Sequence, residues 1–175
     1  MLKNQQAPIP PARWALLALV CAGSLAFDQW TKQWAWDHLQ PGAGGARLLW
    51  DPVLELAFAY NRGSAFGVVR EVSHPQILVV IAALLVGWTI FAVRRSGRLG
   101  FLGAGLVAGG ALGNLYDRLL RSDGLGRSGV VDFIKVNFPW GGSWPTFNVA
   151  DAVLVVGAVL LIWGLRERPV AVAAA

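Results

Sequence analysis

Apolar residues gather into four long runs, separated by segments in which Gly, Pro and polar residues prevail. The runs predict helices over residues 14–32, 76–93, 99–120 and 147–166. Each is close to the roughly 20 residues that a helix needs to cross the hydrocarbon core of a bilayer. A water-soluble helix bundle is the alternative, but four such runs leave too little polar surface to face water. The pattern therefore predicts an all-α membrane protein with four transmembrane helices, built as a single integral membrane domain over residues 1–175.

The segment between the first two helices predicts a small β-element over about residues 41–70. Residues 48–50 and 53–60 have strand-like composition, with a turn signal between them. Asn61-Arg62-Gly63 is a second turn signal, followed by the apolar stretch 65–69. We expect this element to lie on the outer surface of the membrane. The other long connection begins with a stretch rich in Gly and Ser, whose composition predicts flexibility.

Composition supports a membrane environment. Hydrophobic residues make up 55% of the chain and charged residues only 14%, against about 25% charged residues in soluble domains. Nine Trp and 21 Gly fit this environment, because Trp gathers at membrane interfaces and Gly at close helix contacts. Cys21 is the one cysteine, beside two distant His. We therefore expect no disulfide within the chain, no metal site and no cofactor.

The net charge of +5 has a topological explanation and does not indicate nucleic acid. Basic residues cluster, with almost no acids, in the N-terminal segment, the short link between the second and third helices, and the C-terminal segment: Lys3, Arg13, Arg94, Arg95, Arg98, Arg166 and Arg168. Such segments stay on the cytoplasmic side of a membrane. Both termini are therefore expected in the cytoplasm and both long connections outside it. The start of the chain imitates a lipoprotein signal peptide ending at Cys21, but Val20 does not suit its cleavage site, so a retained helix is expected.

Polar residues inside membrane helices are costly and often functional. They cluster at the predicted outer helix ends. Asp28 and Lys32 are four residues apart and can pair; taken alone, this pair is best explained as a helix-end ion pair with Lys32 extending outward. The third helix carries a stripe for close packing that ends in a carboxylate, and an adjacent stripe that ends in polar residues: Gly105, Gly109, Gly113 and Asp117; Gly110, Asn114 and Arg118.

Asn114, Asp117 and Arg118 lie within little more than one turn, which implies a polar cavity or a partner chain. A purely structural exchange of charge with neighbouring helices remains open for Asp117. At the start of the fourth helix, Asn148 and Asp151 share a face, where Asn148 can cap the helix and Asp151 can interact with its dipole.

Asp132 stands in the apolar stretch Val130–Ile134, which a surface charge explains poorly. Two carboxylates close together in a half-dry site tend to share a proton. The ionised one can activate water, while the protonated one polarises a carbonyl and later protonates the leaving amine. This is aspartic peptide hydrolysis. The pattern alone does not choose Asp132 and Asp151 over Asp28 and Asp117.

Five segments, in order along the chain, resemble the lipoprotein signal peptidase family, also called signal peptidase II. They are Asp28-Gln29-Trp30-Thr31-Lys32, Asn61-Arg62-Gly63-Ser64-Ala65-Phe66-Gly67, residues 109–118, Val130-Val131-Asp132-Phe133 and residues 147–151. The resemblance implies an enzyme of the bacterial inner membrane that acts near the periplasmic face. It removes the signal peptide from prolipoproteins, cutting before a cysteine that carries diacylglycerol.

The resemblance also implies roles for single residues, without any cofactor. Asp132 and Asp151 match the catalytic pair. Asn114, Arg118 and Asn148 match residues that line the site and hold the substrate backbone, and Asn61 matches a residue that contacts substrate. The matches with a more structural role are Asp28, Lys32 and Asp117. The implied partners are diacylglyceryl-modified prolipoproteins, membrane lipid and, as inhibitors, cyclic peptide antibiotics, with no nucleic acid.

One stretch departs from the family pattern, because residues 121–129 form a longer connection than is usual, which can alter the cover over the site. Two other classes of protein remain. A transporter or channel could use Asp28, Asp117 and Asp151 as an ion or proton relay, but the charges gather at one end of the helices and no inverted repeat is visible. A scaffold subunit would explain the Gly stripe but neither Asp132 nor Asp151.

Overall fold

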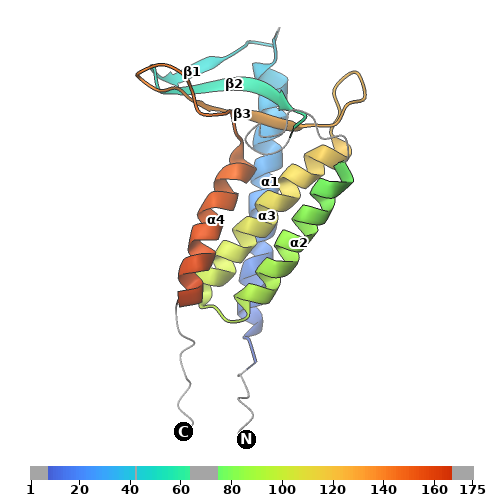
Figure 1. The fold of residues 1–175 in the computed structure, drawn as a ribbon, viewed down its shortest axis with the longest axis vertical. Helices are drawn as coiled ribbons and strands as arrows, with labels where there is room; N and C mark the ends of the chain where they lie inside the picture. The colour runs from blue at the N-terminus through green and yellow to red at the C-terminus, as the bar shows by residue number, and fades with distance from the viewer. Residues whose placement is uncertain (1–7, 42, 64–74, 167–175) are drawn as a thin grey trace, which may run out of the picture.

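A computed structural model describes residues 8–41, 43–63 and 75–166. Its helices form a bundle, and a three-stranded sheet lies across one end of it (Figure 1). The elements in chain order are α1 (Pro11–Leu39), β1 (Arg47–Trp50), β2 (Leu54–Asn61), α2 (Pro75–Val93), α3 (Arg98–Leu120), β3 (Val130–Val136) and α4 (Val149–Arg166). The chain is thus mostly helical with a small sheet, which is the class that the apolar pattern predicts.

Three of the described helices are long and apolar enough to cross a membrane: α1, α3 and α4. α2 is also apolar, but its stretch Val79–Val93 is shorter than the other three. Large apolar side chains such as Phe91, Val159 and Trp163 are more than half exposed on the outside of the bundle. Such a surface suits a lipid environment, in which apolar side chains lose nothing by exposure.

α3 packs closely against two neighbours through its glycines. A Cβ atom at Gly105 would lie 2.8 Å from the Leu17 carbonyl oxygen of α1. On the other side of α3, a Cβ atom at Gly110 would lie 2.6 Å from the Ala150 carbonyl oxygen of α4. Backbone atoms cannot give way as flexible side chains do, so only Gly permits these approaches. The two predicted stripes therefore face α1 and α4 respectively.

The start of α1, the link between α2 and α3, and the end of α4 meet at the end of the bundle away from the sheet (Figure 1). Arg13 Nη1 donates to the Ser96 carbonyl at 3.4 Å, and the Gly97 amide donates to the Gly164 carbonyl at 3.1 Å. The described parts of three basic segments that are far apart in sequence therefore border the same end of the molecule.

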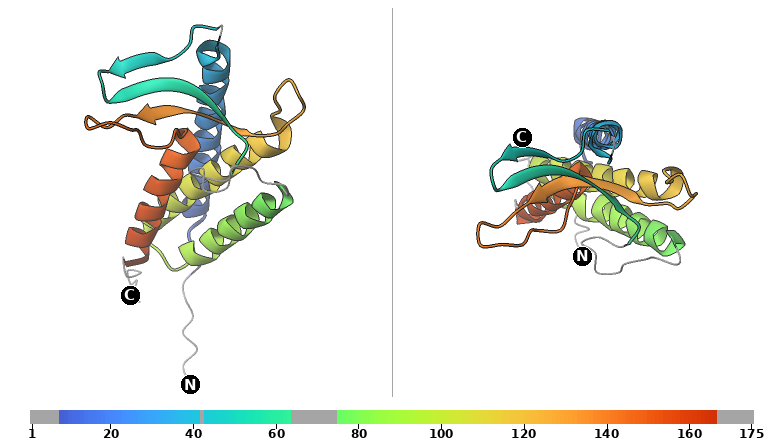
Figure 2. Two further views of the ribbon diagram at one scale, coloured as in Figure 1. Left: turned by 45° about the horizontal axis from the view of Figure 1, so that its top comes forward. Right: turned by 90° about the horizontal axis from the view of Figure 1, so that it is seen from above.

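The sheet differs from the predicted β-element in the strands that it contains. Its strands are antiparallel in the order β1-β2-β3, and seen along the bundle they lie across the helix ends (Figure 2). β3 comes from the second long connection, which the sequence did not predict to join the sheet. Val131 and Phe133 of β3 are buried against Ala35 and Leu39 of α1. The same contacts explain why α1 continues to Leu39, beyond its predicted end. The predicted stretch 65–69 lies outside the described residues.

The stretch after α3 forms a small hairpin, although its composition predicted flexibility. Ser122 and Ser128 form an isolated bridge, and the Asp123 carboxylate accepts bonds from the Leu125 and Arg127 amides, both at 2.9 Å. It also pairs with Arg127 Nε at 2.8 Å. Asp residues order turns by such local bonds, which a count of Gly and Ser does not register.

Candidate active site

Asp132 and Asp151 lie where the sheet meets the helix ends. Asp132 is on β3, opposite Ala59 of β2, and its side chain is only 3% exposed. Asp151 is in the first turn of α4 and is partly buried. The predicted pair is therefore brought to one place by two different elements.

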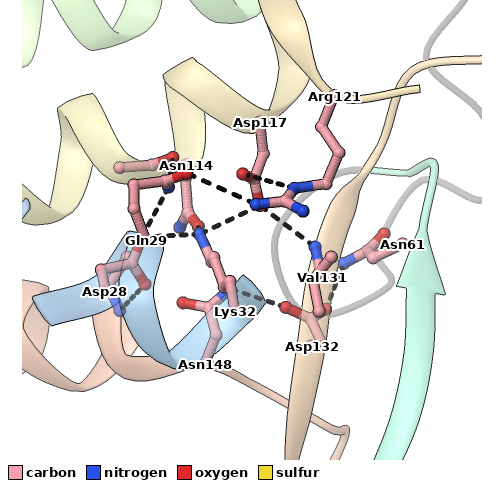
Figure 3. A network of polar contacts seen from close by, with 12 residues as sticks. Asp28, Gln29, Lys32, Asn61, Asn114, Asp117, Arg121, Val131, Asp132 and Asn148 are labelled. Carbon is pink, nitrogen blue, oxygen red and sulfur yellow. Dashed lines mark hydrogen bonds and ion pairs between the residues drawn. The ribbon is translucent and has the colours of Figure 1, made fainter. Parts of the chain in front are cut away.

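Among the described residues, a hydrogen-bond donor reaches each oxygen of the two carboxylates. Asp132 Oδ2 accepts from Asn61 Nδ2 at 2.9 Å, and Asp132 Oδ1 accepts from Asn148 Nδ2 at 2.7 Å (Figure 3). Asp151 Oδ1 accepts from Asn114 Nδ2 at 2.8 Å, and Asp151 Oδ2 accepts from the Asn148 amide at 3.2 Å. Asn148 thus contacts both carboxylates and joins them.

The start of α4 is closed by a reciprocal cap. Asn148 Oδ1 accepts a bond from the Asp151 amide at 3.0 Å, while the Asp151 carboxylate accepts one from the Asn148 amide. This is the arrangement of a capping box. The capping role predicted for Asn148 is therefore present, and it fixes the position of the Asp151 side chain at the start of α4.

A small cavity of about 30 Å³ opens between the two carboxylates and their neighbours. This is room for at least one water molecule. Its lining comes from β2, α3, β3, the approach to α4 and the first turn of α4: Asn61, Asn114, Arg118, Val130, Asp132, Thr146, Phe147 and Asp151. The sequence pattern did not single out Val130, Thr146 or Phe147 as part of the site. The one signal for them was their place beside Asp132 and Asn148 in the chain.

Asp132 has the electrostatics of a carboxyl group that can hold a proton near neutral pH. Burial raises the pKa of Asp132 from 3.8 to about 6. The bond from Asn61 lowers that pKa, the charge of Asp151 raises it, and the bond from Asn148 lowers it. Arg118, half-buried on α3, lines the cavity and interacts electrostatically with both Asp132 and Asp151.

Asp28, Lys32 and Asp117 form a separate cluster, and all three side chains are fully buried. Lys32 Nζ lies 2.9 Å from Asp28 Oδ2 and 3.3 Å from Asp117 Oδ2, and it donates to Asn114 Oδ1 at 2.8 Å (Figure 3). The predicted Asp28–Lys32 pair is present, but the expectation that Lys32 extends outward is wrong. The second carboxylate and the amide give its ammonium group enough partners inside the protein.

The two acids of this cluster hold backbone segments that lead into the cavity. Asp28 Oδ1 accepts from the Ala150 amide at 2.8 Å, and Asp117 Oδ2 accepts from the Val131 amide at 3.2 Å. Neither acid lines the cavity, whereas Asp132 and Asp151 both do. Position therefore separates two pairs of acids that the sequence pattern alone left equivalent.

Two polar residues of this cluster were not singled out from the sequence. Gln29 donates to Asp28 Oδ2 and to the Gly113 carbonyl, both at 3.1 Å. Arg121 Nε lies 3.0 Å from Asp117 Oδ1. The spacing of four residues between Asp117 and Arg121 was a signal that could have found this second ion pair.

Among the described residues, no group of three or more His, Cys, Asp or Glu side chains is arranged to hold a metal ion. The donors around the cavity are amides and a guanidinium group. The arrangement suits a water molecule held between two carboxylates that share one proton.

Comparison with known proteins gives a consistent result. The sequence profile of the family described as signal peptidase (SPase) II matches residues 20–166. A lipoprotein signal peptidase of Rhodococcus jostii is 37% identical over 157 residues, which cover 89% of this chain and 74% of the relative. One of Chlorobium phaeobacteroides is 37% identical over 163 residues, which cover 85% of this chain and 94% of the relative.

Solved structures also resemble the fold. A bacterial membrane enzyme determined by the in meso method at 2.3 Å resolution matches with a TM-score of 0.70 and 26% identity, over 85% of this chain and 86% of that chain. A second, at 1.9 Å resolution, matches with a TM-score of 0.69 and 26% identity, over 86% and 92% of the two chains.

Proposed function

Because the chain belongs to the signal peptidase II family, we propose that it removes the signal peptide from bacterial prolipoproteins as an aspartic endopeptidase with Asp132 and Asp151 as its catalytic pair. The observation that carries this proposal is the cavity that both carboxylates line, with room for water between them. Cleavage before the diacylglyceryl-modified cysteine is the part of the proposal that rests on the family resemblance.

The two carboxylates have different roles in this proposal. Asp132 is the more deeply buried and has a pKa of about 6, so it holds the shared proton. Asp151 lies at the positive end of α4 and accepts bonds from Asn114 and Asn148, and it acts as the base. Asp151 takes a proton from water as the oxygen attacks the scissile carbonyl, and Asp132 donates to the carbonyl oxygen. As the C–N bond breaks, the proton on Asp151 passes to the leaving amine, and a hydroxyl group of the tetrahedral intermediate returns a proton to Asp132 as the new carboxyl group forms.

The remaining site residues hold the pair and the substrate. Asn61, Asn114 and Asn148 orient the two carboxylates through the bonds described above. Arg118 brings a positive charge to the cavity wall, where negative charge develops on the carbonyl oxygen. The buried ion cluster supports this arrangement by bonding Asn114 and the backbone next to each catalytic residue; its members are Asp28, Lys32 and Asp117.

We further propose a single membrane domain with four spanning helices, α2 among them, and with both termini in the cytoplasm. The basic segments bordering one end of the bundle support this orientation. The sheet and the cavity lie at the opposite end, so in this proposal they are near the periplasmic face. The charged clusters gather at that end and do not thread through the bundle, so a proton relay across the membrane has no support here.

The substrate partners are prolipoproteins whose cysteine carries diacylglycerol, drawn from the surrounding lipid. Cyclic peptide antibiotics would act as inhibitors that contact Asn61. The direct test uses the purified chain in detergent with a lipid-modified precursor and mass spectrometry of the products. We expect a new N-terminus at the modified cysteine and no cleavage of the unmodified precursor. A lipid-modified precursor that stays intact would contradict the proposal.

A further inference from the structure

The side chain of Asn114 stands between the buried ion cluster and the proposed catalytic pair. Its Nδ2 donates to Asp151 Oδ1 at 2.8 Å, and its Oδ1 accepts from Lys32 Nζ at 2.8 Å (Figure 3 shows Lys32 and Asn114 directed at one another). An amide can rotate by half a turn with little change of shape, so its orientation is decided by its hydrogen-bond partners.

Lys32 decides that orientation because an ammonium group has three donors and no acceptor. In the reversed orientation, Asn114 Nδ2 would face the ammonium group and Oδ1 would face the Asp151 carboxylate. Both bonds would then be lost. The second donor to Asn114 Oδ1 is Asn148 Nδ2 at 3.1 Å, and the Asp151 amide holds Asn148 in this orientation by donating to Asn148 Oδ1. Of the two donors, Lys32 makes the shorter bond and the one that carries a charge.

Lys32 is itself held in place. Its three ammonium hydrogens face three oxygens, on Asp28, Asp117 and Asn114, and its side chain is fully buried. Arg121 pairs with the other oxygen of Asp117, so two cations balance two carboxylates. A buried cluster in which every charge is paired has one arrangement and little freedom to move. It therefore holds the Lys32 ammonium group in a fixed position beside the Asn114 amide.

We propose that Lys32 is a positioning residue, which fixes the Asn114 amide so that Asn114 Nδ2 is directed at the Asp151 carboxylate. This rests on the proposed function, because it explains how one of the two catalytic carboxylates is kept as a hydrogen-bond acceptor. Asn148 extends the effect to Asp132, since its Nδ2 bonds both Asn114 Oδ1 and Asp132 Oδ1. A purely structural Lys32 would only join α1 to α3.

The test compares Lys32→Met with Arg121→Gln, which is a matched control. Both variants remove a cation from Asp117, but Arg121 does not bond Asn114. Cleavage of lipid-modified precursor is measured across pH, with thermal unfolding in detergent as the folding readout. For Lys32→Met we expect kcat per folded enzyme to fall about 10- to 100-fold with KM little changed, as for loss of a bond to a charged group.

We also expect the alkaline limb of the kcat profile of Lys32→Met to move to higher pH, because the charge of Lys32 lowers the pKa of Asp132 and its loss lets the protonated acid persist. The other charges that face Asp132, on Asp151 and Arg118, are unchanged. Arg121→Gln should unfold at a lower temperature but keep kcat and the pH profile. If Lys32→Met does not fold, the charge-balanced pair Lys32→Met with Asp28→Asn carries the same expectation. Asn at position 28 keeps an oxygen for the Ala150 amide.

Two results would separate the possible failures. A folded Lys32 variant with the kcat and pH profile of the original chain would overturn the positioning role, while leaving the catalytic pair untouched. Full activity in Asp132→Asn or Asp151→Asn would instead overturn the proposed function. Equal losses of kcat in the Lys32 and Arg121 variants, in step with their loss of folded protein, would show a structural role alone.

Discussion

At the scale of residues, neutral amides donate the hydrogen bonds to the two carboxylates, Arg118 lines the same cavity, and the ion pairs of Lys32 lie one layer farther away. Asn61 and Asn148 each bond Asp132, whereas Lys32 pairs with Asp28 and Asp117. A cation in direct contact lowers the pKa of a carboxyl group by about 1–3 units. Amide donors lower it less, so burial prevails and the pKa of Asp132 remains near 6. The amides therefore allow a proton to be shared near neutral pH.

The pH dependence of cleavage should change when Asn61 is replaced by Leu. The Asn61 bond favours the ionised form of Asp132, so its loss raises the pKa of Asp132 by about one unit, the equivalent of one hydrogen bond. Because Asp132 acts as the acid, its protonated form then persists to higher pH, and the alkaline limb of the kcat profile moves up. Asn137→Leu is the control, since Asn137 bonds Glu55 outside the cavity. An alkaline limb that stays in place or moves down would contradict the assignment of Asp132 as the acid.

Residue by residue, the sequence was informative where a polar side chain broke an apolar run. Asp28, Asn114, Asp117 and Asp132 were all visible in this way. What could not be predicted was which acids share a cavity. Asp28 and Asp117 do not line the cavity because they accept hydrogen bonds from backbone amides elsewhere. Asp28 bonds the Ala150 amide, 122 residues away, and Asp117 bonds the Val131 amide, 14 residues away. Spacing within one helix contains no information about such partners.

At the scale of elements, α3 is the helix on which the other helices of the site pack. Its glycines let α1 and α4 approach closely enough for Asn114 to reach both Lys32 and Asp151. The periodic Gly positions were readable from the sequence because a step of four residues returns to the same helix face. The strand β3 was not predicted, although its Val, Ile and Phe residues suit a strand, because its pairing with β2 is a long-range contact that the local pattern does not show.

Substitution of Gly110 by Ala should destabilise the protein by about 1–3 kcal/mol, as overpacking does. The added Cβ would meet the Ala150 carbonyl, which is next to Asp151 and cannot move without displacing α4. Activity should fall together with the unfolding temperature. Gly87→Ala in α2 is the matched control, because nothing lies within 4 Å of a Cβ atom there. A Gly110→Ala variant as stable as Gly87→Ala would mean that α3 and α4 are not packed as described.

At the scale of the whole molecule, charge and polar chemistry occupy opposite ends of an apolar bundle. The basic segments border one end, and the sheet, the ion cluster and the cavity occupy the other (Figure 1). Apolar periodicity and basic residues were enough to predict the bundle and this division. The sheet that covers the site could not be predicted in full, because the pairing of β2 with β3 is a tertiary contact that no local sequence pattern indicates.

The orientation in the membrane follows from this division and can be tested with fusions. A reporter that is active only in the cytoplasm, joined after the C-terminal residue, should be active, and the same reporter inserted in the 121–129 hairpin should not. The hairpin insertion is the control, since it lies at the end that carries the cavity. The opposite pattern would reverse the proposed topology.

The catalytic pair itself is tested most directly by kcat for lipid-modified precursor in Asp132→Asn and Asp151→Asn, measured separately on folded protein. Asp123→Asn is the control, because that carboxylate belongs to the 121–129 hairpin. We predict that each of the first two substitutions lowers kcat by about 100- to 10,000-fold, the range expected for loss of an acid or base, while Asp123→Asn leaves it within about twofold. Retention of full kcat by a folded Asp132→Asn or Asp151→Asn variant would contradict this account.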